Sequence, residues 1–226
     1  MQLTTLLGKT LLLETEPNGT MLGNMLVRRG FSPELEVDTT FRTPTIADLY
    51  DPFLFPGMEV AVDRIFKARE NKERVVIFGD YDVDGISSTA LLVRFFTEIG
   101  IEVSYRLPHR VHDGYGMKSY FMDELAEKSV KLVISVDCGT RDIAVIAHAK
   151  SLGIDVIVTD HHAIPEVIPQ EVVAILNPKL PGSTYPFAGL SGSGVAFKLL
   201  SAVASRLYEG PDLEEVLLSF IDFASL

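Results

Sequence analysis

The chain has 226 residues, 47% of them hydrophobic and 23% charged, which suits one large globular domain or a domain with an arm. No stretch approaches the ~18 consecutive apolar residues of a membrane span, and a secretory leader pattern is missing, so we expect a cytoplasmic monomer with no membrane partner. A single cysteine, Cys138, excludes an internal disulfide framework. The formal net charge of −11 argues against binding of a long nucleic-acid backbone by electrostatic attraction alone. A nucleic-acid contact would therefore be local, aided by a metal ion, or shared with protein parts outside this sequence.

Residues 1–59 are predicted to form an arm that packs on a core domain of residues 60–226. Helical spacing over residues 21–29 ends at Gly30, and several prolines then divide the arm into short pieces. The expected anchors of the arm are its aromatic residues Phe41, Tyr50, Phe53 and Phe55.

From residue 58 onward, helical patterns and apolar strand patterns alternate. Strands are expected at 75–78, 101–107, 131–136, 154–159 and 172–176, and helices at 58–69, 86–99, 119–128, 141–152, 192–208 and 213–221. Short, nearly continuous apolar strands that alternate with helices are typical of a parallel sheet covered on both faces. We therefore predict an α/β fold with a doubly wound, Rossmann-like sheet.

Polar residues follow four of the predicted strands. They are Asp80, Asp137, the segment Asp160-His161-His162, and Asn177. Right-handed crossovers bring the carboxyl ends of parallel strands to one edge of the sheet, where ligands bind in folds of this kind. The sequence therefore predicts a polar site at that edge. A dinucleotide cofactor is not expected, because no Gly-x-Gly-x-x-Gly motif follows the first strand.

Three carboxylates, Asp80, Asp82 and Asp84, stand at alternate positions after the first strand. Such a cluster repels itself unless a cation neutralises it, and a hard divalent metal suits clustered oxygens. An EF-hand is excluded because a strand precedes the run and Leu91 stands where that loop needs glutamate. A solvated acidic turn is the alternative for the run taken alone, and the other strand ends favour the metal.

Carboxylates together with the histidine pair suit a site for manganese, zinc, iron or magnesium. We expect His161 to be a ligand and His162 to face the substrate, where it could bind a phosphate or assist proton transfer. This composition is typical of two-metal phosphoester chemistry, in which Asp84 or Asp137 could bridge the ions.

Three further segments fit a phosphate substrate, each with a structural alternative. Ser87, Ser88 and Thr89 open a helix and could bind an anion or simply cap it. Arg106, His109 and Arg110 form a local basic patch or a solvated loop. The glycine-rich segment 189–194, which contains Gly192 and Gly194, could approach a ligand closely or allow tight helix packing.

Three segments carry a resemblance to the DHH phosphoesterase superfamily: residues 79–89, 136–139 and 159–162. Residues 113–116 and 192–197 are similar to its RecJ branch, the bacterial single-strand-specific exonucleases. The resemblance implies metal-dependent 5′–3′ hydrolysis of single-stranded DNA in recombination and repair, with two Mn²⁺ or Mg²⁺ ions.

The resemblance also implies roles for individual residues. The implied metal ligands are Asp80, Asp82, Asp84, Asp137, His161 and Asp222, with Asp80 the one whose role differs among branches. The resemblance places His162 at the scissile phosphate and Arg110 near bound DNA. From the residues themselves we expect Asp84 and Asp137 to act with His162, and Ser88, Gly192 and Gly194 to line the substrate site. The implied partners are a single-strand binding protein and a helicase.

The chain departs from the family pattern at its end. The fourth motif begins at Asp222 and would normally continue beyond Leu226 into a DHHA1 domain and an oligonucleotide-binding fold. We therefore expect a catalytic core that binds DNA weakly and with reduced processivity.

Two alternatives belong to the same superfamily. One is a phosphoesterase for nanoRNA, cyclic dinucleotides or pyrophosphate, but those branches usually have histidine where this chain has Phe78. The other is a non-catalytic replication scaffold, which would need lost ligands, and the expected ligands are all present.

Overall fold

The computed structural model describes residues 2–4, 10–12, 20–32 and 45–224. The chain divides into two compact units, Met1–Leu49 and Tyr50–Leu226, so the described boundary precedes the expected one at residue 60. Of the expected arm anchors, Phe41 lies outside the described residues.

The described part of the first unit contains four short elements. Strands β1 (Gln2–Thr4) and β2 (Thr10–Leu12) pair antiparallel. Helix α1 (Met21–Arg28) starts at Thr20, whose hydroxyl accepts a hydrogen bond from the Gly23 amide at 3.1 Å. The 3₁₀ helix η2 (Ile46–Asp48) ends the unit.

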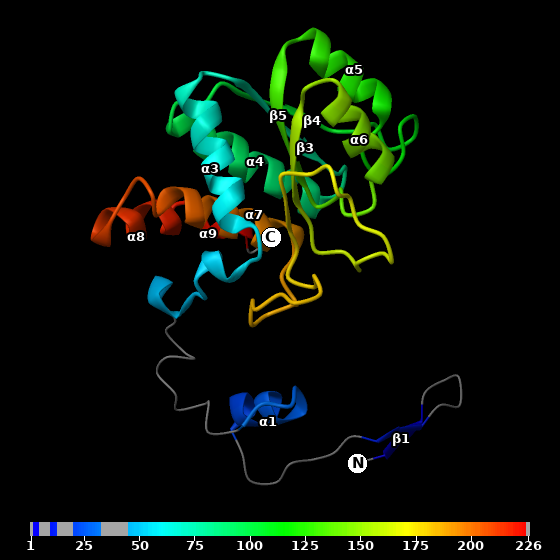
Figure 1. Cartoon of the computed structure of the whole chain (residues 1–226). Coiled ribbons are helices and arrows are strands. Elements are labelled where there is room, and N and C mark those ends of the chain that lie inside the picture. The colour runs from blue at the N-terminus through cyan, green and yellow to red at the C-terminus, as the bar shows by residue number, and fades with distance from the viewer. Residues whose placement is uncertain (1, 5–9, 13–19, 33–44, 225–226) are drawn as a thin grey trace. The chain divides into compact units, whose positions relative to one another are not determined.

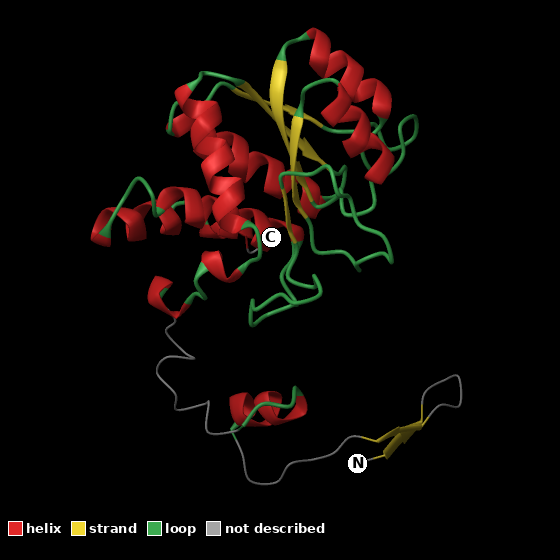
Figure 2. Ribbon diagram, viewed as in Figure 1, coloured by secondary structure: helices red, strands yellow, loops and turns green. Residues whose placement is uncertain are grey.

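The second unit is built on a five-stranded parallel sheet (Figures 1 and 2). Its order is β4-β3-β5-β6-β7, with all neighbours parallel. The strands are β3 (Arg74–Gly79), β4 (Val103–Arg106), β5 (Val130–Val136), β6 (Asp155–Thr159) and β7 (Ala174–Leu176). The predicted α/β fold with a parallel sheet is therefore confirmed.

Helices cover both faces of this sheet (Figure 1). Helices α3 (Met58–Glu70), α4 (Val83–Glu98) and α7 (Gly192–Ala204) contact it on one face, and α5 (Ser119–Glu127) and α6 (Ile143–Ser151) on the other. Helices α8 (Gly210–Leu218) and α9 (Ile221–Ala224) follow α7. No helix in the described part of the chain has the length and apolar character needed to cross a membrane.

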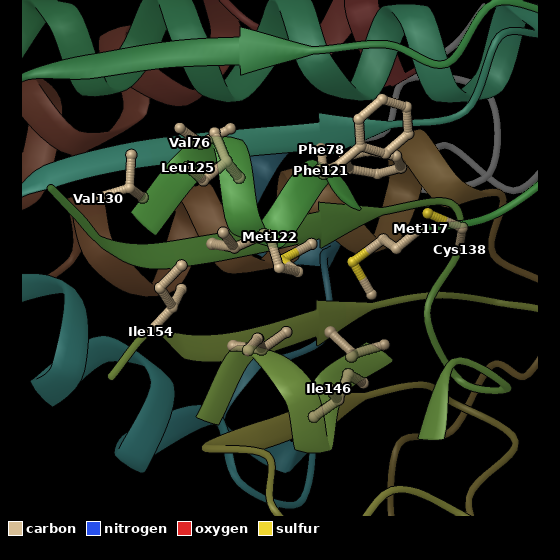
Figure 3. Packing of buried hydrophobic residues seen from close by; sticks show 14 of the residues in the cluster. Val76, Phe78, Met117, Phe121, Met122, Leu125, Val130, Cys138, Ile146 and Ile154 are labelled. Atoms are coloured by element: carbon tan, nitrogen blue, oxygen red, sulfur yellow. The ribbon is translucent and has the colours of Figure 1, made fainter. Parts of the chain in front are cut away.

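Alternate residues of each strand supply the two halves of the core. In β3, Val76 and Phe78 point toward α5 and α6, and the ring of Phe78 lies 5.6 Å from that of Phe121 (Figure 3). Cys138 is fully buried in the same cluster, where burial raises the pKa of its thiol well above the usual value. Each large side chain buried here contributes roughly 1.5–3 kcal/mol to folding.

Helix α4 begins at Val83, earlier than the periodicity predicts. Asp82 is its N-cap, and its Oδ1 accepts a hydrogen bond from the Gly85 amide at 3.0 Å. Asp82 and Asp84 therefore belong to the start of the helix, whereas Asp80 lies between β3 and the helix. This places Asp84 in the first turn of α4, where a negative charge interacts favourably with the helix dipole.

Residues at the start of the second unit contact the loop before α7, α7 itself and the turn that follows it. The Phe55 ring, next to the 3₁₀ helix η3 (Pro52–Leu54), lies 4.2 Å from that of Tyr185. The Tyr50 carbonyl accepts a hydrogen bond from Lys198 Nζ at 2.7 Å. Phe53, within η3, lies under the Arg206 guanidinium at 5.9 Å. These contacts hold η3 against the core.

Candidate active site

Three neighbouring strands deliver aspartates to the same edge of the sheet. The register pairs Gly79 of β3 with Val136 of β5, and Val136 with Thr159 of β6. The next residue of each strand is therefore an aspartate at this edge: Asp80, Asp137 and Asp160. All three are buried, with 1–4% of their surface exposed. A site at the carboxyl edge is thus built directly by the strand topology.

Asp80, Asp82 and Asp137 form one group of candidate metal ligands. One carboxylate oxygen from each lies within 4.8 Å of the others. Within the described residues, the Oδ1 atoms of Asp80 and Asp137 are buried and receive no hydrogen bond. Burial raises the pKa of the Asp137 carboxyl to about 6, although His161 acts in the opposite direction, and burial also raises the pKa of Asp80. These oxygens need a proton or a cation.

His161, at the next strand end, forms a second group of candidate ligands with Asp137 and His162. Its Nε2 lies 3.1 Å from Asp137 Oδ1 and 3.7 Å from Asp84 Oδ2. Its Nδ1 lies 3.1 Å from the Leu190 carbonyl oxygen, which can only accept, so Nδ1 carries a proton. In the neutral ring, Nε2 then turns a lone pair toward a carboxylate oxygen. The Asp137 carboxylate accordingly raises the pKa of His161 above its usual value.

His162 is held by a different aspartate. Its Nδ1 lies 2.7 Å from Asp160 Oδ1, and the Tyr115 hydroxyl lies 3.4 Å from the same nitrogen. Burial opposes ionisation of Asp160, but hydrogen bonds from Thr140 and His162 outweigh it and lower the pKa of this carboxyl. The His162 side chain is 43% exposed. Asp160 therefore orients a ring that faces outward.

Asp84 is bound by the start of α7. Its Oδ2 accepts a hydrogen bond from the Gly192 amide and its Oδ1 one from the Ser193 amide, both at 2.7 Å. The glycine-rich segment therefore binds a carboxylate of its own chain. Gly194 is also used locally, because its amide donates to the Ser191 hydroxyl at 3.1 Å.

The remaining predicted residues lie around this cluster or away from it. Ser88 is fully buried, and its hydroxyl donates to the Asp84 carbonyl at 2.5 Å, so it acts within α4 and does not reach the open side of the site. The Arg110 guanidinium lies 5.1 Å from the centre of the Tyr81 ring. Asp222 is exposed in α9, and it is not among the groups of candidate ligands within the described residues.

Asn177, Lys179 and Thr140 support the histidine pair or the aspartate that orients it. The Asn177 side-chain amide donates to the His162 carbonyl at 3.0 Å, and the Lys179 amine donates to the His161 carbonyl. The Thr140 amide donates to Asp160 at 3.1 Å. For Asp160 and Asn177, the signal was their position at a strand end. For Lys179, no sequence pattern indicated it.

The site suits a divalent cation. Two buried carboxylate oxygens have no other hydrogen-bond partner in the described part of the chain, and His161 Nε2 lies 3.1 Å from the Asp137 oxygen. The other ring nitrogen of His161, Nδ1, donates a hydrogen bond to the Leu190 carbonyl, as metal-bound histidines commonly do. A mixed set of carboxylate oxygens and imidazole nitrogen fits manganese, magnesium or zinc better than calcium.

Comparison with known proteins places these features in a family. The sequence model of the DHH family, N-terminal domain, matches residues 74–221. The single-stranded-DNA-specific exonuclease RecJ of Bacillus subtilis (strain 168) is 40% identical over 187 residues, which is 83% of this chain and 24% of the relative. RecJ of Escherichia coli (strain K12) is 39% identical over 152 residues, which is 67% of this chain and 26% of the relative.

Two solved structures are similar to this chain. A crystal structure of exonuclease RecJ bound to manganese has a TM-score of 0.67 and 33% identity, and it covers 75% of this chain and 42% of that one. RecJ from Thermus thermophilus in complex with Mn²⁺ has a TM-score of 0.61 and 30% identity, covering 75% of this chain and 23% of that one. The chain spans about a quarter of the length of the curated relatives it matches.

Proposed function

The chain belongs to the DHH family, and we propose that it is the catalytic core of a RecJ-like exonuclease that hydrolyses phosphodiester bonds of single-stranded DNA. One observation carries the proposal. The buried Asp137 Oδ1 has no other hydrogen-bond partner among the described residues, and His161 Nε2 lies 3.1 Å away from it. A proton on Nε2 or a cation between the two atoms satisfies this contact, and Mn²⁺ is bound in the similar exonuclease.

In this proposal the metal ligands come from the three strand ends and from α4. They are Asp80, Asp82, Asp84, Asp137 and His161, with Asp222 as a further ligand from α9. Two Mn²⁺ or Mg²⁺ ions, when bound, would supply Lewis-acid stabilisation for the negative charge that develops on the phosphate oxygens. The chain holds these side chains in fixed positions. The buried strand ends that carry them exclude water from the protein side of the site.

His162 is proposed to act directly on the substrate. Because its Nδ1 faces Asp160, only Nε2 is available, and it makes no hydrogen bond to a described residue. That atom could donate to a phosphate oxygen or give a proton to the leaving oxygen. Asp160 would stabilise the protonated ring in either case, in the manner of a catalytic Asp-His pair.

Arg110 and Tyr81 are proposed to contact the DNA strand beside the metal ligands. The guanidinium over the tyrosine ring offers a positive charge for a phosphate and a flat surface for a base. Association with a single-strand binding protein or a helicase is part of the same proposal, and it rests on the family resemblance alone.

The test compares substrates and metals. Single-stranded DNA labelled at either end, a cyclic dinucleotide and pyrophosphate are each incubated with the protein in Mn²⁺ and in EDTA. We expect Mn²⁺-dependent release of nucleotides from single-stranded DNA, starting at the 5′ end. Cleavage of a small substrate without cleavage of DNA, by this chain and by the full-length protein, would contradict the proposal.

Asp137→Ala identifies the site within this test. We expect the variant to lose DNA cleavage while its free energy of unfolding in EDTA stays near that of the wild type, because the lost carboxylate is buried and poorly compensated. The matched control is Asp212→Ala, which removes an exposed carboxylate from α8 and should retain activity. An active Asp137→Ala variant would exclude Asp137 from the chemistry.

A further inference from the structure

We propose that the start of α7 positions Asp84 for metal binding, and that Gly192 is required there because it has no side chain. The inference rests on the proposed function in that it takes Asp84 and Asp137 to be metal ligands. It adds a role for a segment that contributes no ligand of its own.

The contact between α7 and Asp84 is bidentate. Gly192 and Ser193 are the first two residues of α7, and their amides have no acceptor within the helix. Each donates to a different oxygen of Asp84 at 2.7 Å. The thirteen-residue helix also directs the positive end of its dipole at this carboxylate. Two short, charge-assisted bonds fix both the rotamer and the plane of the carboxylate.

Gly192 allows α7 to approach a second carboxylate as well. A Cβ atom at this position would lie 2.6 Å from Asp137 Oδ1 and 2.8 Å from the Cβ and Cγ atoms of Asp137. Asp137 cannot easily move away, because it is buried and its backbone has a φ of +59°. A side chain at residue 192 would therefore displace α7, Asp137 or both. Glycine lets the helix contact both carboxylates at once.

This arrangement prepares Asp84 for a cation before one arrives. Each carboxylate oxygen has two lone pairs, and each uses one for an α7 amide. The other pair stays available, and Oδ2 lies 3.7 Å from His161 Nε2. Helices α4 and α7 pack against each other, so Asp84 is held from both sides (Figure 1). Holding a ligand in place in advance removes the entropy cost of ordering it when the metal binds.

The test compares two glycines of the same helical turn. Gly192→Ala adds a methyl group against Asp137, whereas Gly194→Ala adds one 3.2 Å from the mobile end of the Leu190 side chain. Binding of Mn²⁺ alone to the purified protein is measured by calorimetry and by the loss of the free-Mn²⁺ electron paramagnetic resonance signal. We expect Gly192→Ala to weaken binding about 10–100-fold, the usual effect of removing support from a metal ligand. Gly194→Ala should stay within about threefold of the wild type, since its neighbour can yield.

Ser193→Pro is a second variant, which tests the amide itself. Proline is tolerated in the first turn of a helix, and the preceding residue is glycine, which has no Cβ to clash with the ring. It replaces one of the two donors to Asp84 by the ring Cδ, which meets the Asp84 Oδ1 atom, and it places no methyl group on Asp137. We expect weaker Mn²⁺ binding here too, with a smaller loss than in Gly192→Ala, and unfolding in EDTA checks that the variants are folded.

The outcomes separate this inference from the proposed function. In one outcome, all four proteins (the wild type, Gly194→Ala, Gly192→Ala and Ser193→Pro) bind Mn²⁺ with the same affinity. In that case α7 does not position Asp84, but the proposed metal site is still supported. If Gly192→Ala does not fold, the Ser193→Pro result decides alone. If the wild type binds no Mn²⁺, both the proposed metal site and this inference are overturned.

Discussion

Asp160 differs from the aspartates around it in having its hydrogen bonds complete. Its Oδ1 accepts from the amides of His161 and His162 at 2.7 and 3.1 Å and lies 2.7 Å from His162 Nδ1, while its Oδ2 accepts from the Thr140 amide. Asp80 and Asp137 each keep one buried oxygen without a donor among the described residues. Carboxylates in similar positions along neighbouring strands therefore have different uses. Asp160 orients a side chain, and the other two are available for a cation.

Asp160→Asn tests this division at the level of one residue. The amide cannot stabilise a protonated His162, and it can present an N–H to Nδ1, which selects the wrong tautomer. We expect kcat for DNA cleavage at saturating Mn²⁺ to fall about 100-fold or more, while Mn²⁺ affinity measured by calorimetry changes little.

The double variant Asp160→Asn/His162→Asn is the control for that prediction. Because the two residues would act as a unit, its activity should be close to that of His162→Asn alone. Losses that multiply in the double variant would show that Asp160 acts independently of His162.

Helix α7 has functions at both of its faces and along its length. The backbone amides of its first turn bind Asp84. More than one turn later, Lys198 donates a hydrogen bond to the Tyr50 carbonyl and so holds the segment around η3. The lysine is 4% exposed, and its amine lies 5.8 Å from the centre of the Tyr185 ring. Burial lowers the pKa of Lys198 to about 8, with the charge of Asp51 acting in the opposite direction. The same helix thus joins the candidate metal site to the start of the core unit.

The Lys198 contact predicts a specific pH dependence of stability. In the unfolded chain the amine keeps the ordinary lysine pKa of 10.5, so between pH about 8 and 10.5 the unfolded state binds more protons than the folded state. The free energy of unfolding contributed by this group therefore rises with pH across that window. Lys198→Met should flatten the rise. Urea unfolding of both proteins from pH 7.5 to 10 measures the difference, and identical pH slopes would contradict the assignment.

At the scale of the whole molecule, the acidic balance and the candidate site belong together. Part of the net charge of −11 comes from carboxylates that meet at one edge of the sheet. Without a cation they repel one another and also repel DNA phosphates. A bound cation would reduce both the repulsion between the carboxylates and their repulsion of DNA. Metal binding should therefore raise both the free energy of unfolding and the affinity for DNA.

Mn²⁺ titration tests this coupling in the intact chain. A ligand that binds only the folded state at 100 times its Kd adds about 2.7 kcal/mol to the free energy of unfolding. We expect Mn²⁺ to raise the Tm, EDTA to reverse the rise, and Asp137→Asn to remove most of it.

Affinity for DNA should follow the same titration. Fluorescence anisotropy with a short single-stranded oligonucleotide, under Ca²⁺ or with a non-hydrolysable backbone to prevent cleavage, should show weak binding in EDTA and tighter binding with divalent metal. Equal affinity with and without divalent metal would mean that the site does not govern DNA binding.

The sequence by itself determined the sheet and the convergence of the site. Apolar strands of four to seven residues alternating with helices can bury their surface only in a parallel, two-faced layer, and strand polarity then brings the residues that follow each strand to one edge. For this reason the sequence predicts Asp80, Asp82, Asp137, His161 and His162 as residues of one site. The structure places these residues in two overlapping groups of candidate ligands.

Only the tertiary structure decided which hydrogen-bond partner each of the candidate site residues has. Asp84 and Gly192 are 108 positions apart in the chain, and no local pattern pairs a helix start with a distant carboxylate. The role of Ser88 could not be predicted from sequence either, because a serine hydroxyl in the first turns of a helix can contact a ligand or hydrogen-bond to the backbone. In this structure the Ser88 hydroxyl hydrogen-bonds to the backbone. Periodicity is set by each segment alone and can be read from sequence. The choice of hydrogen-bond partner depends on angstrom-scale packing between segments, which only the folded chain fixes.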